Sequence, residues 1–266
     1  MTEKMLRLAE LVRHLPATRH LTPQAAGRNA FTRGLDAILL WIRRYLPPIH
    51  WLGASLFGVA LFIYVWTVAR TSRLTTAGAH AWPDVPDRAV LAIWHDSAPS
   101  LLVALAKRKS RAEVAIMVAT EPRGDSLAVL CRLLGLRVIR GDWEHHGWPS
   151  VGRLAKQISA GACALITPDG GAPRRVARAG ALVLAAAAGV PLIPIGAECY
   201  PALREPHKWD QPRNPLPFGQ IAISIDPALK PDDFPDTAAL ESARLDLEQA
   251  LNASANRARE ALGLPH

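Results

Sequence analysis

Residues 89–102 read AVLAIWHDSAPSLL, and this stretch decides how the rest of the chain is interpreted. The apolar run Ala89–Trp94 predicts a strand, which delivers His95 and Asp96 to its end just before a helical pattern begins. Ligands bind at the carboxyl ends of the strands of parallel α/β sheets, so His95 is a candidate catalytic residue. A plainer interpretation stays open, in which Asp96 or Ser97 is only the N-cap of the helix.

Short apolar runs alternate with helical patterns through the remainder of the chain. The apolar runs cover residues 89–94, 114–119, 136–139, 163–167, 191–195 and 221–225. The helical patterns cover residues 97–107, 126–134, 150–159, 176–188 and, at the end, 238–262. This alternation is typical of βαβ units. We therefore predict an α/β fold with a mostly parallel central sheet flanked by helices.

The N-terminal region has a different character and predicts attachment to a membrane. Residues 1–16 have the pattern of a basic amphipathic helix, typical of a surface that lies on anionic lipid. The apolar run 49–69 contains no Asp, Glu, Lys or Arg and, at about 1.5 Å per residue, is long enough to cross a hydrocarbon core. Because arginines flank both of its ends, spanning and in-plane placements both stay open, and a buried core helix is the third alternative.

Two regions follow from these patterns. We predict a membrane-attachment region of amphipathic and hydrophobic helices over residues 1–73 and the α/β domain over residues 74–266, with a polar linker at 71–87. With half of its residues hydrophobic, the chain can bury a sizeable core and is not disordered.

The net charge of +8 suits anionic lipid headgroups, phosphate-bearing substrates or nucleic acid. The basic residues are spread out and no aromatic stacking platform is visible, so we expect no nucleic-acid partner. The three cysteines lie far apart without metal-ligand spacing, which indicates buried thiols in a reducing compartment.

Charged side chains follow four of the predicted strands. They lie in the segments 95–96 (HD), 121–125 (EPRGD), 140–142 (RGD) and 168–175 (PDGGAPRR). Because the carboxyl ends of parallel strands meet at one edge, we expect these groups to form one site with a histidine, carboxylates and arginines. Such a site suits base catalysis on a phosphate-bearing or otherwise anionic substrate.

Several motifs in residues 88–226 together resemble the lysophospholipid acyltransferase superfamily, and its bacterial domain-of-unknown-function-374 branch in particular. In order, they are WHDSAP, GDS, LGLRVIRG, ALITPDGGAPRRV, AGVPLIPIG, KWD and PLPF. The resemblance implies transfer of a fatty acyl group from a thioester, on coenzyme A or acyl carrier protein, to the hydroxyl of a lysophospholipid or related lipid. It implies no metal and no organic cofactor, and a place on the cytoplasmic face of the inner membrane.

The resemblance also implies roles for individual residues. His95 is the general base that removes the proton of the attacking hydroxyl. The substrate-binding residues are Arg123, Arg140, Asp169, Gly170 and Arg174, with the arginines on the acceptor's phosphate and Asp169 and Gly170 shaping the turn beside it.

One position departs from the superfamily's pattern. Most members carry an acid five residues after the histidine, where this chain has Ser100. We expect Asp125 to orient the imidazole instead, with Asp96 as the second choice. The alternative to an active acyltransferase, which Ser100 keeps open, is a membrane lipid-binding protein of acyltransferase descent that no longer catalyses a reaction.

Two further hypotheses start from short motifs. Residues 124–127 read GDSL, which would make Ser126 the nucleophile of an esterase, but the one Asp-x-x-His pair, Asp142 and His145, follows too closely and no Asn-Asp pair exists. Residues 142–146 (DWEHH) invite a metal site, but their spacing fits no usual zinc pattern, and a polar loop explains them.

Overall fold

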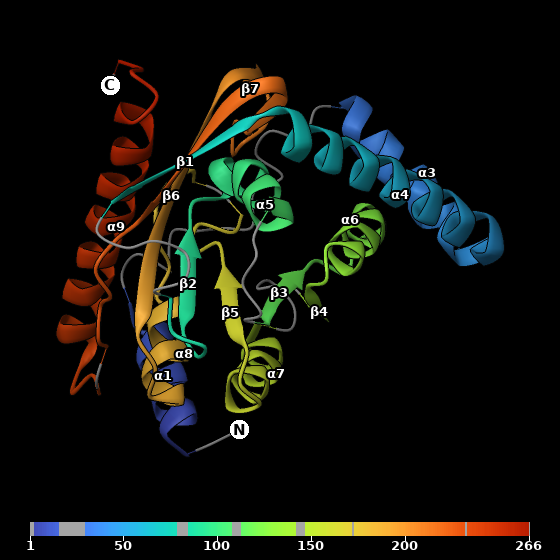
Figure 1. Ribbon diagram of the computed structural model, residues 1–266. Helices are drawn as coiled ribbons and strands as arrows, with labels where there is room; N and C mark the ends of the chain where they lie inside the picture. Colours follow the sequence, from blue (N-terminus) through green and yellow to red (C-terminus); the bar gives the residue numbers. More distant parts are fainter. Residues whose placement is uncertain are drawn as a thin grey trace.

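A seven-stranded sheet organises the chain (Figure 1). The computed structural model describes residues 3–15, 30–78, 85–107, 113–141, 147–171, 173–231 and 233–265. The strands are β1 (Arg73–Gly78), β2 (Val90–Ile93), β3 (Val114–Val118), β4 (Arg137–Arg140), β5 (Cys163–Ile166), β6 (Leu192–Arg204) and β7 (Arg213–Ile225). Their order is β1-β7-β6-β2-β5-β3-β4, and every neighbouring pair is parallel except β6 and β7. The predicted α/β fold with a mostly parallel sheet is confirmed.

Helices cover both faces of this sheet. They are α1 (Glu3–Arg13), α3 (Ala30–Tyr45), α4 (Pro47–Thr71), the 3-10 turn η2 (His95–Ser97), α5 (Ala98–Lys107), α6 (Pro122–Leu133), α7 (Gly147–Ser159), α8 (Gly180–Ala188) and α9 (Thr237–Glu260). One hydrophobic cluster joins the sheet to α1, α7, α8 and α9, and a second joins it to α4, α5 and α6.

Strand β2 shows why the strands read as continuous apolar runs. Val90, Ala92 and Trp94 pack into the first cluster, whereas Leu91 and Ile93 pack into the second. Successive side chains of a strand point to opposite faces, and here both faces are covered by helices. Every residue of β2 is therefore buried, and the alternation with polar residues that marks a half-exposed strand is absent from it.

The structure differs from the predicted linker and from the predicted strand lengths. Residues 73–78, expected to lie in a polar linker, form β1, an edge strand whose residues are mostly exposed. A strand at the edge of a sheet buries few side chains, so its sequence need not show the run of apolar residues that marks a central strand. Strands β6 and β7 extend well beyond the predicted apolar runs into a Pro-rich antiparallel ribbon.

Helix α1 does not present an apolar face to lipid. Met5 and Leu8, together with Leu15 just beyond the helix, are buried in the first hydrophobic cluster, where the helix packs against α8 and α9. The expectation that residues 1–16 lie on a membrane surface is therefore wrong for this helix, because its apolar side is already occupied by the protein core.

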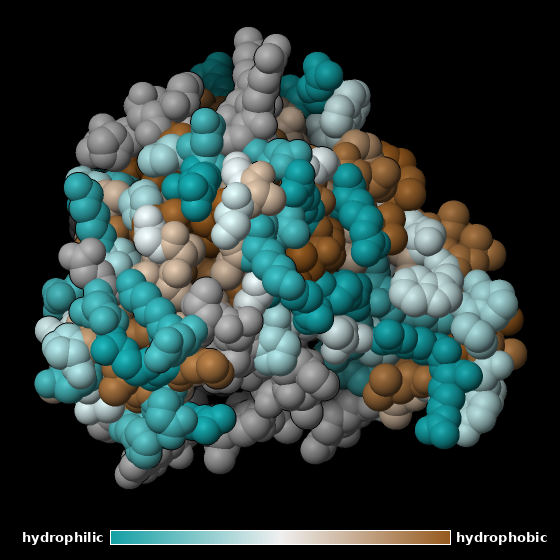
Figure 2. Space-filling view, turned by 90° about the horizontal axis from the view of Figure 1, so that it is seen from below, coloured by the Kyte–Doolittle hydropathy of each residue, from teal (hydrophilic) through white to brown (hydrophobic). Residues whose placement is uncertain are grey.

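Helix α4 is the one helix in the described part of the chain that is long and apolar enough to cross a membrane. One side packs against α5, α6 and β7, and its buried residues are His50, Ala54, Gly58, Val65, Val68 and Ala69. The opposite side carries an exposed stripe of Leu52, Leu56, Val59, Ile63 and Trp66. Apolar side chains gather at the same end of the molecule in the space-filling view (Figure 2). A fully buried core helix is thereby excluded.

Candidate active site

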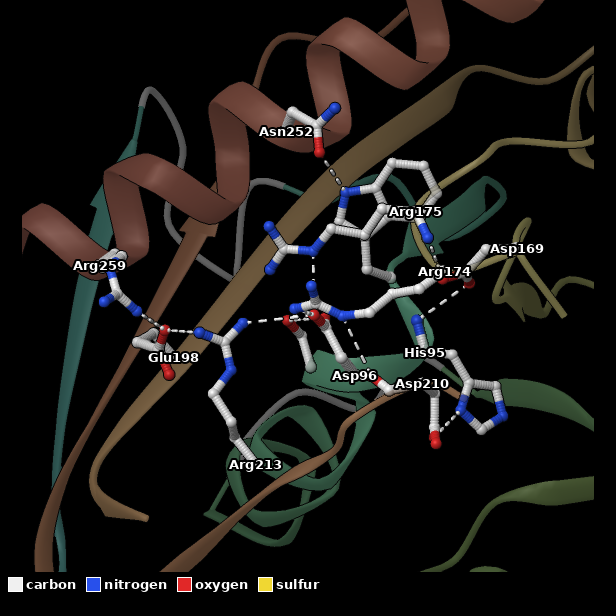
Figure 3. A network of polar contacts seen from close by, with 12 residues as sticks. His95, Asp96, Asp169, Arg174, Arg175, Glu198, Asp210, Arg213, Asn252 and Arg259 are labelled. Carbon is white, nitrogen blue, oxygen red and sulfur yellow. Dashed lines mark hydrogen bonds and ion pairs between the residues drawn. The ribbon is translucent and has the colours of Figure 1, made fainter. Parts of the chain in front are cut away.

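His95 lies in the turn between β2 and α5, at the carboxyl edge of the sheet (Figure 3). Its backbone N–H donates to Asp169 Oδ1 at 3.0 Å. Asp169 follows β5, which pairs directly with β2, and its second oxygen accepts the N–H of Arg175 at 3.2 Å. The predicted Thr-Pro-Asp-Gly turn is closed by Gly170, whose N–H donates to the Thr167 carbonyl at 3.1 Å. Asp169 thus fastens this turn to the backbone of the histidine.

The carboxylate that bonds the His95 ring is Asp210, which lies in the connection between β6 and β7. Nδ1 of His95 is 2.8 Å from Oδ2 of Asp210, whose side chain is 10% exposed. The neighbouring Trp209 ring lies 5.2 Å from the imidazole, centroid to centroid. The motif KWD had marked these two residues as part of the resemblance, but no role was predicted for Asp210.

This geometry sets the protonation of His95. Burial alone would lower the pKa of His95, but the hydrogen bond and charge of Asp210, together with the charges of Asp169 and Asp96, raise it above its ordinary value. In the neutral ring, Nδ1–H donates to Asp210 and Nε2 carries the lone pair. The His95 side chain is 43% exposed, so the imidazole is accessible from outside the fold.

Burial sets the direction of the pKa shift of Asp169. It is 1% exposed, and burial raises its pKa above the ordinary value, opposed by the positive charge of His95 and by the backbone N–H groups of Arg175 and His95. Its function in the structure is to hold the backbone of the turn.

Arginines gather around two buried carboxylates beside His95 (Figure 3). Asp96 pairs with Arg174, with Arg175 at 2.9 Å and with Arg213 at 3.4 Å. Glu198 pairs with Arg213 and, at 3.1 Å, with Arg259. We call these six residues the arginine cluster. Four guanidinium groups face two carboxylates in it, so its net charge is positive.

Asp96 is therefore not the simple helix cap of the plainer interpretation. Burial would raise its pKa, but the charges of Arg175, Arg213 and Arg174 hold the pKa below its ordinary value. Arg174 also donates from Nε to the Asp210 carbonyl at 3.2 Å. This bond joins the arginine cluster to the residue that binds the imidazole.

Asp125, expected to orient His95, lies in a different cluster. Its carboxylate is 2.8 Å from His50 Nε2 on α4 and 2.6 Å from Arg140 Nη2, with Arg43 of α3 at 3.6 Å. The expectation of a His95–Asp125 pair is wrong, because α3 and α4 supply partners for Asp125 that the strand pattern could not reveal. The four strand-end groups thus form two clusters rather than one site.

The remaining predicted residues have other surroundings. Arg123 pairs with Asp36 of α3 at 2.6 Å. Ser100, in the position of the usual acid, is buried, with its hydroxyl beside the thiol of Cys199. Ser126 is buried on α6. Residues 142–146, on which the metal hypothesis and the esterase partners depend, lie outside the described residues.

Comparison with known proteins finds similarity among solved structures. No protein-family model matches the chain, and no curated protein matches it. Among solved structures, the chain is similar to the 1-acyl-sn-glycerophosphate (LPA) acyltransferase PlsC from Thermotoga maritima. The two are 15% identical, with a TM-score of 0.47, over 95% of this chain and 96% of that one.

Proposed function

We propose that the protein is a membrane-associated O-acyltransferase that moves a fatty acyl group from a thioester to the hydroxyl of a phosphate-bearing lipid. The observation that carries the proposal is the bonded pair of His95 and Asp210 beside the arginine cluster. A half-exposed imidazole with its Nδ1 bound to a carboxylate is the arrangement that general-base catalysis requires.

In the proposed reaction this pair moves the proton between the two substrates. Nε2 of His95 takes the proton of the acceptor hydroxyl as its oxygen attacks the thioester carbonyl. The tetrahedral intermediate collapses with cleavage of the C–S bond, and the leaving thiolate takes the proton from the imidazolium. Asp210 keeps Nδ1 protonated and stabilises the imidazolium between these steps. Coenzyme A and acyl carrier protein supply the same thioester, so both are candidate donors.

The arginine cluster supports a phosphate-bearing acceptor. Arg174 and Arg175 are 33% and 24% exposed while paired with Asp96, so both guanidinium groups retain accessible surface. Guanidinium groups bind phosphate through paired N–H donors. In this proposal they receive the phosphate because Arg174 also bonds the carbonyl of Asp210, the partner of the imidazole, whereas Arg123 and Arg140 pair with Asp36 and Asp125.

Helix α4 supports attachment to a membrane. Its exposed stripe is apolar, and arginines lie over aromatic rings at both of its ends, with Arg43 6.0 Å from the Trp51 ring and Arg70 4.9 Å from the Trp66 ring. Such pairs suit the interface between headgroups and acyl chains. Because the buried side of α4 packs on the α/β core from His50 to Ala69, we propose that the helix lies in the plane of the interface, on the cytoplasmic face of the inner membrane.

The proposal is tested with the full-length protein, labelled acyl-CoA or acyl-ACP, and a panel of lysophospholipids in vesicles. His95→Ala should abolish acyl transfer while vesicle binding is retained. His207→Ala is the matched control, because His207 is an exposed histidine on the same connection as Asp210. Full turnover by His95→Ala would remove the general-base role. Binding of lipid without transfer by the wild-type protein would favour the non-catalytic lipid-binding alternative.

A further inference from the structure

Phe218 on β7 is held out from the protein in an unfavourable backbone conformation. Its side chain is the most exposed large hydrophobic group described, at 83%, and its φ is +62°. A bulky residue in the left-handed region is a rare outlier that costs free energy and persists only where the surrounding structure enforces it. It lies where the β6–β7 pairing changes register, next to Gly219, whose close approach to the Tyr200 carbonyl leaves little room for a side chain.

Hydrogen bonds attach this part of β7 to the C-terminal half of α4. The Phe218 N–H donates to Thr71 Oγ1 at 3.1 Å, and the Tyr64 hydroxyl donates to the Pro215 carbonyl at 2.7 Å. Ser72 Oγ donates to the Leu216 carbonyl at 3.3 Å. Phe218 therefore lies beside the C-terminal end of α4, where Arg70 stacks on Trp66.

We propose that Phe218 is a second membrane contact, which enters the lipid interface beside the end of α4. The occupant we infer is a bilayer with anionic headgroups, because Arg70 and Arg73 are exposed at the same end of the helix. This inference rests on the membrane association in the proposed function, but not on its chemistry. The β6–β7 ribbon that carries Phe218 also carries Asp210, so this contact would hold the His95 site close to the lipid surface.

The contact can be measured with an environment-sensitive fluorophore on single introduced cysteines. The native Cys131, Cys163 and Cys199 are at most 2% exposed, so an introduced exposed cysteine is labelled selectively. The test position is Phe218→Cys. Leu56→Cys lies on the exposed stripe of α4, and Leu245→Cys, on the exposed side of α9 across the sheet, is the matched control.

The vesicles contain phosphatidylcholine with or without phosphatidylglycerol. We expect a blue shift and quenching by brominated lipids for the labels at Phe218 and Leu56, stronger with phosphatidylglycerol, and no change at Leu245. Phe218→Gly, which also relieves the backbone strain, should weaken vesicle partitioning about tenfold through the lost burial of the phenyl group. Phe218→Leu should retain most of the partitioning.

The outcomes separate this inference from the proposed function. Insertion at Leu56 with a water-exposed label at Phe218 would overturn the second contact and leave membrane association standing. Failure of both labels to insert would remove membrane association itself. A label at Phe218 that becomes buried without vesicles, in proportion to protein concentration, would show that a second copy of the chain covers it and would also overturn the inference.

Discussion

Asp210→Asn tests whether the carboxylate acts on His95 as the geometry indicates. The substitution keeps the shape of the side chain but removes the negative charge that lies 2.8 Å from Nδ1. A hydrogen bond to a charged group contributes about 1.5–3 kcal/mol, and each 1.4 kcal/mol is a factor of about ten in rate. Because His95 is 43% exposed, the lower half of that range applies, and we expect kcat/KM to fall about ten- to fortyfold.

The same substitution should move the acid limb of the pH profile. Asp210 raises the pKa of His95 by stabilising its protonated form, whereas the general base must be neutral. Activity of the wild-type protein should therefore be lost as the pH falls through this raised pKa, and Asp210→Asn should move the loss to lower pH.

Initial rates of acyl transfer between pH 5 and 9 measure both effects. Glu205→Gln is the matched control, because Glu205 lies on the same connection but pairs with Lys208 at 2.7 Å. If Asp210→Asn has the kcat/KM of the wild-type protein and loses activity in acid at the same pH, Asp210 does not act on His95 and the reasoning is refuted.

Four further predictions concern stability and the esterase alternative. A Cβ at Gly196 would overlap the Ser254 carbonyl of α9, so Gly196→Ala should lower the free energy of unfolding in urea by about 1–3 kcal/mol. Gly152→Ala, with open space in the interior of α7, should instead raise it by about 0.5–1 kcal/mol. Asp96→Asn should destabilise the protein by roughly 3 kcal/mol at neutral pH. Because the pKa of Asp96 is lowered in the folded protein, its carboxylate stabilises the fold above its ordinary pKa, and this stabilisation is lost in acid. The difference in free energy of unfolding between Asp96→Asn and wild type should therefore shrink when unfolding is measured at acid pH. Ser126→Ala should leave acyl transfer within about twofold of wild type and unfold within about 1 kcal/mol of it, and a complete loss of activity with intact folding would favour the esterase.

The sequence predicted the centre of the sheet because burial on both faces leaves a strong apolar signal. Strands β2, β3 and β5 begin and end within a residue or so of their apolar runs. The apolar signal is weak where a strand is not covered on both faces. β1 lies at the edge of the sheet and is mostly exposed, and the outer half of the β6–β7 ribbon contains prolines that are typical of loops.

The His95–Asp210 pair shows why a site is harder to predict than a fold. His95 was identified because it directly follows a strand, which is a local signal. Asp210 is 115 positions away in sequence and lies in the connection between β6 and β7, whose outer halves lack a strand pattern in the sequence. The position of a partner across such a distance depends on tertiary packing, which periodicity does not encode.

The error over Asp125 has a more specific cause, and it bears on α4. A carboxylate that is 1% exposed costs several kcal/mol unless charged or polar groups neutralise it. Arg140 comes from the adjacent strand, but His50 and Arg43 come from α4 and α3. If α4 left the core to cross a bilayer alone, Asp125 would lose His50, and Gly58 would lose its close packing against Val129. The longest apolar run in the sequence is therefore part of the α/β core along one side, and only its other side is free to meet lipid.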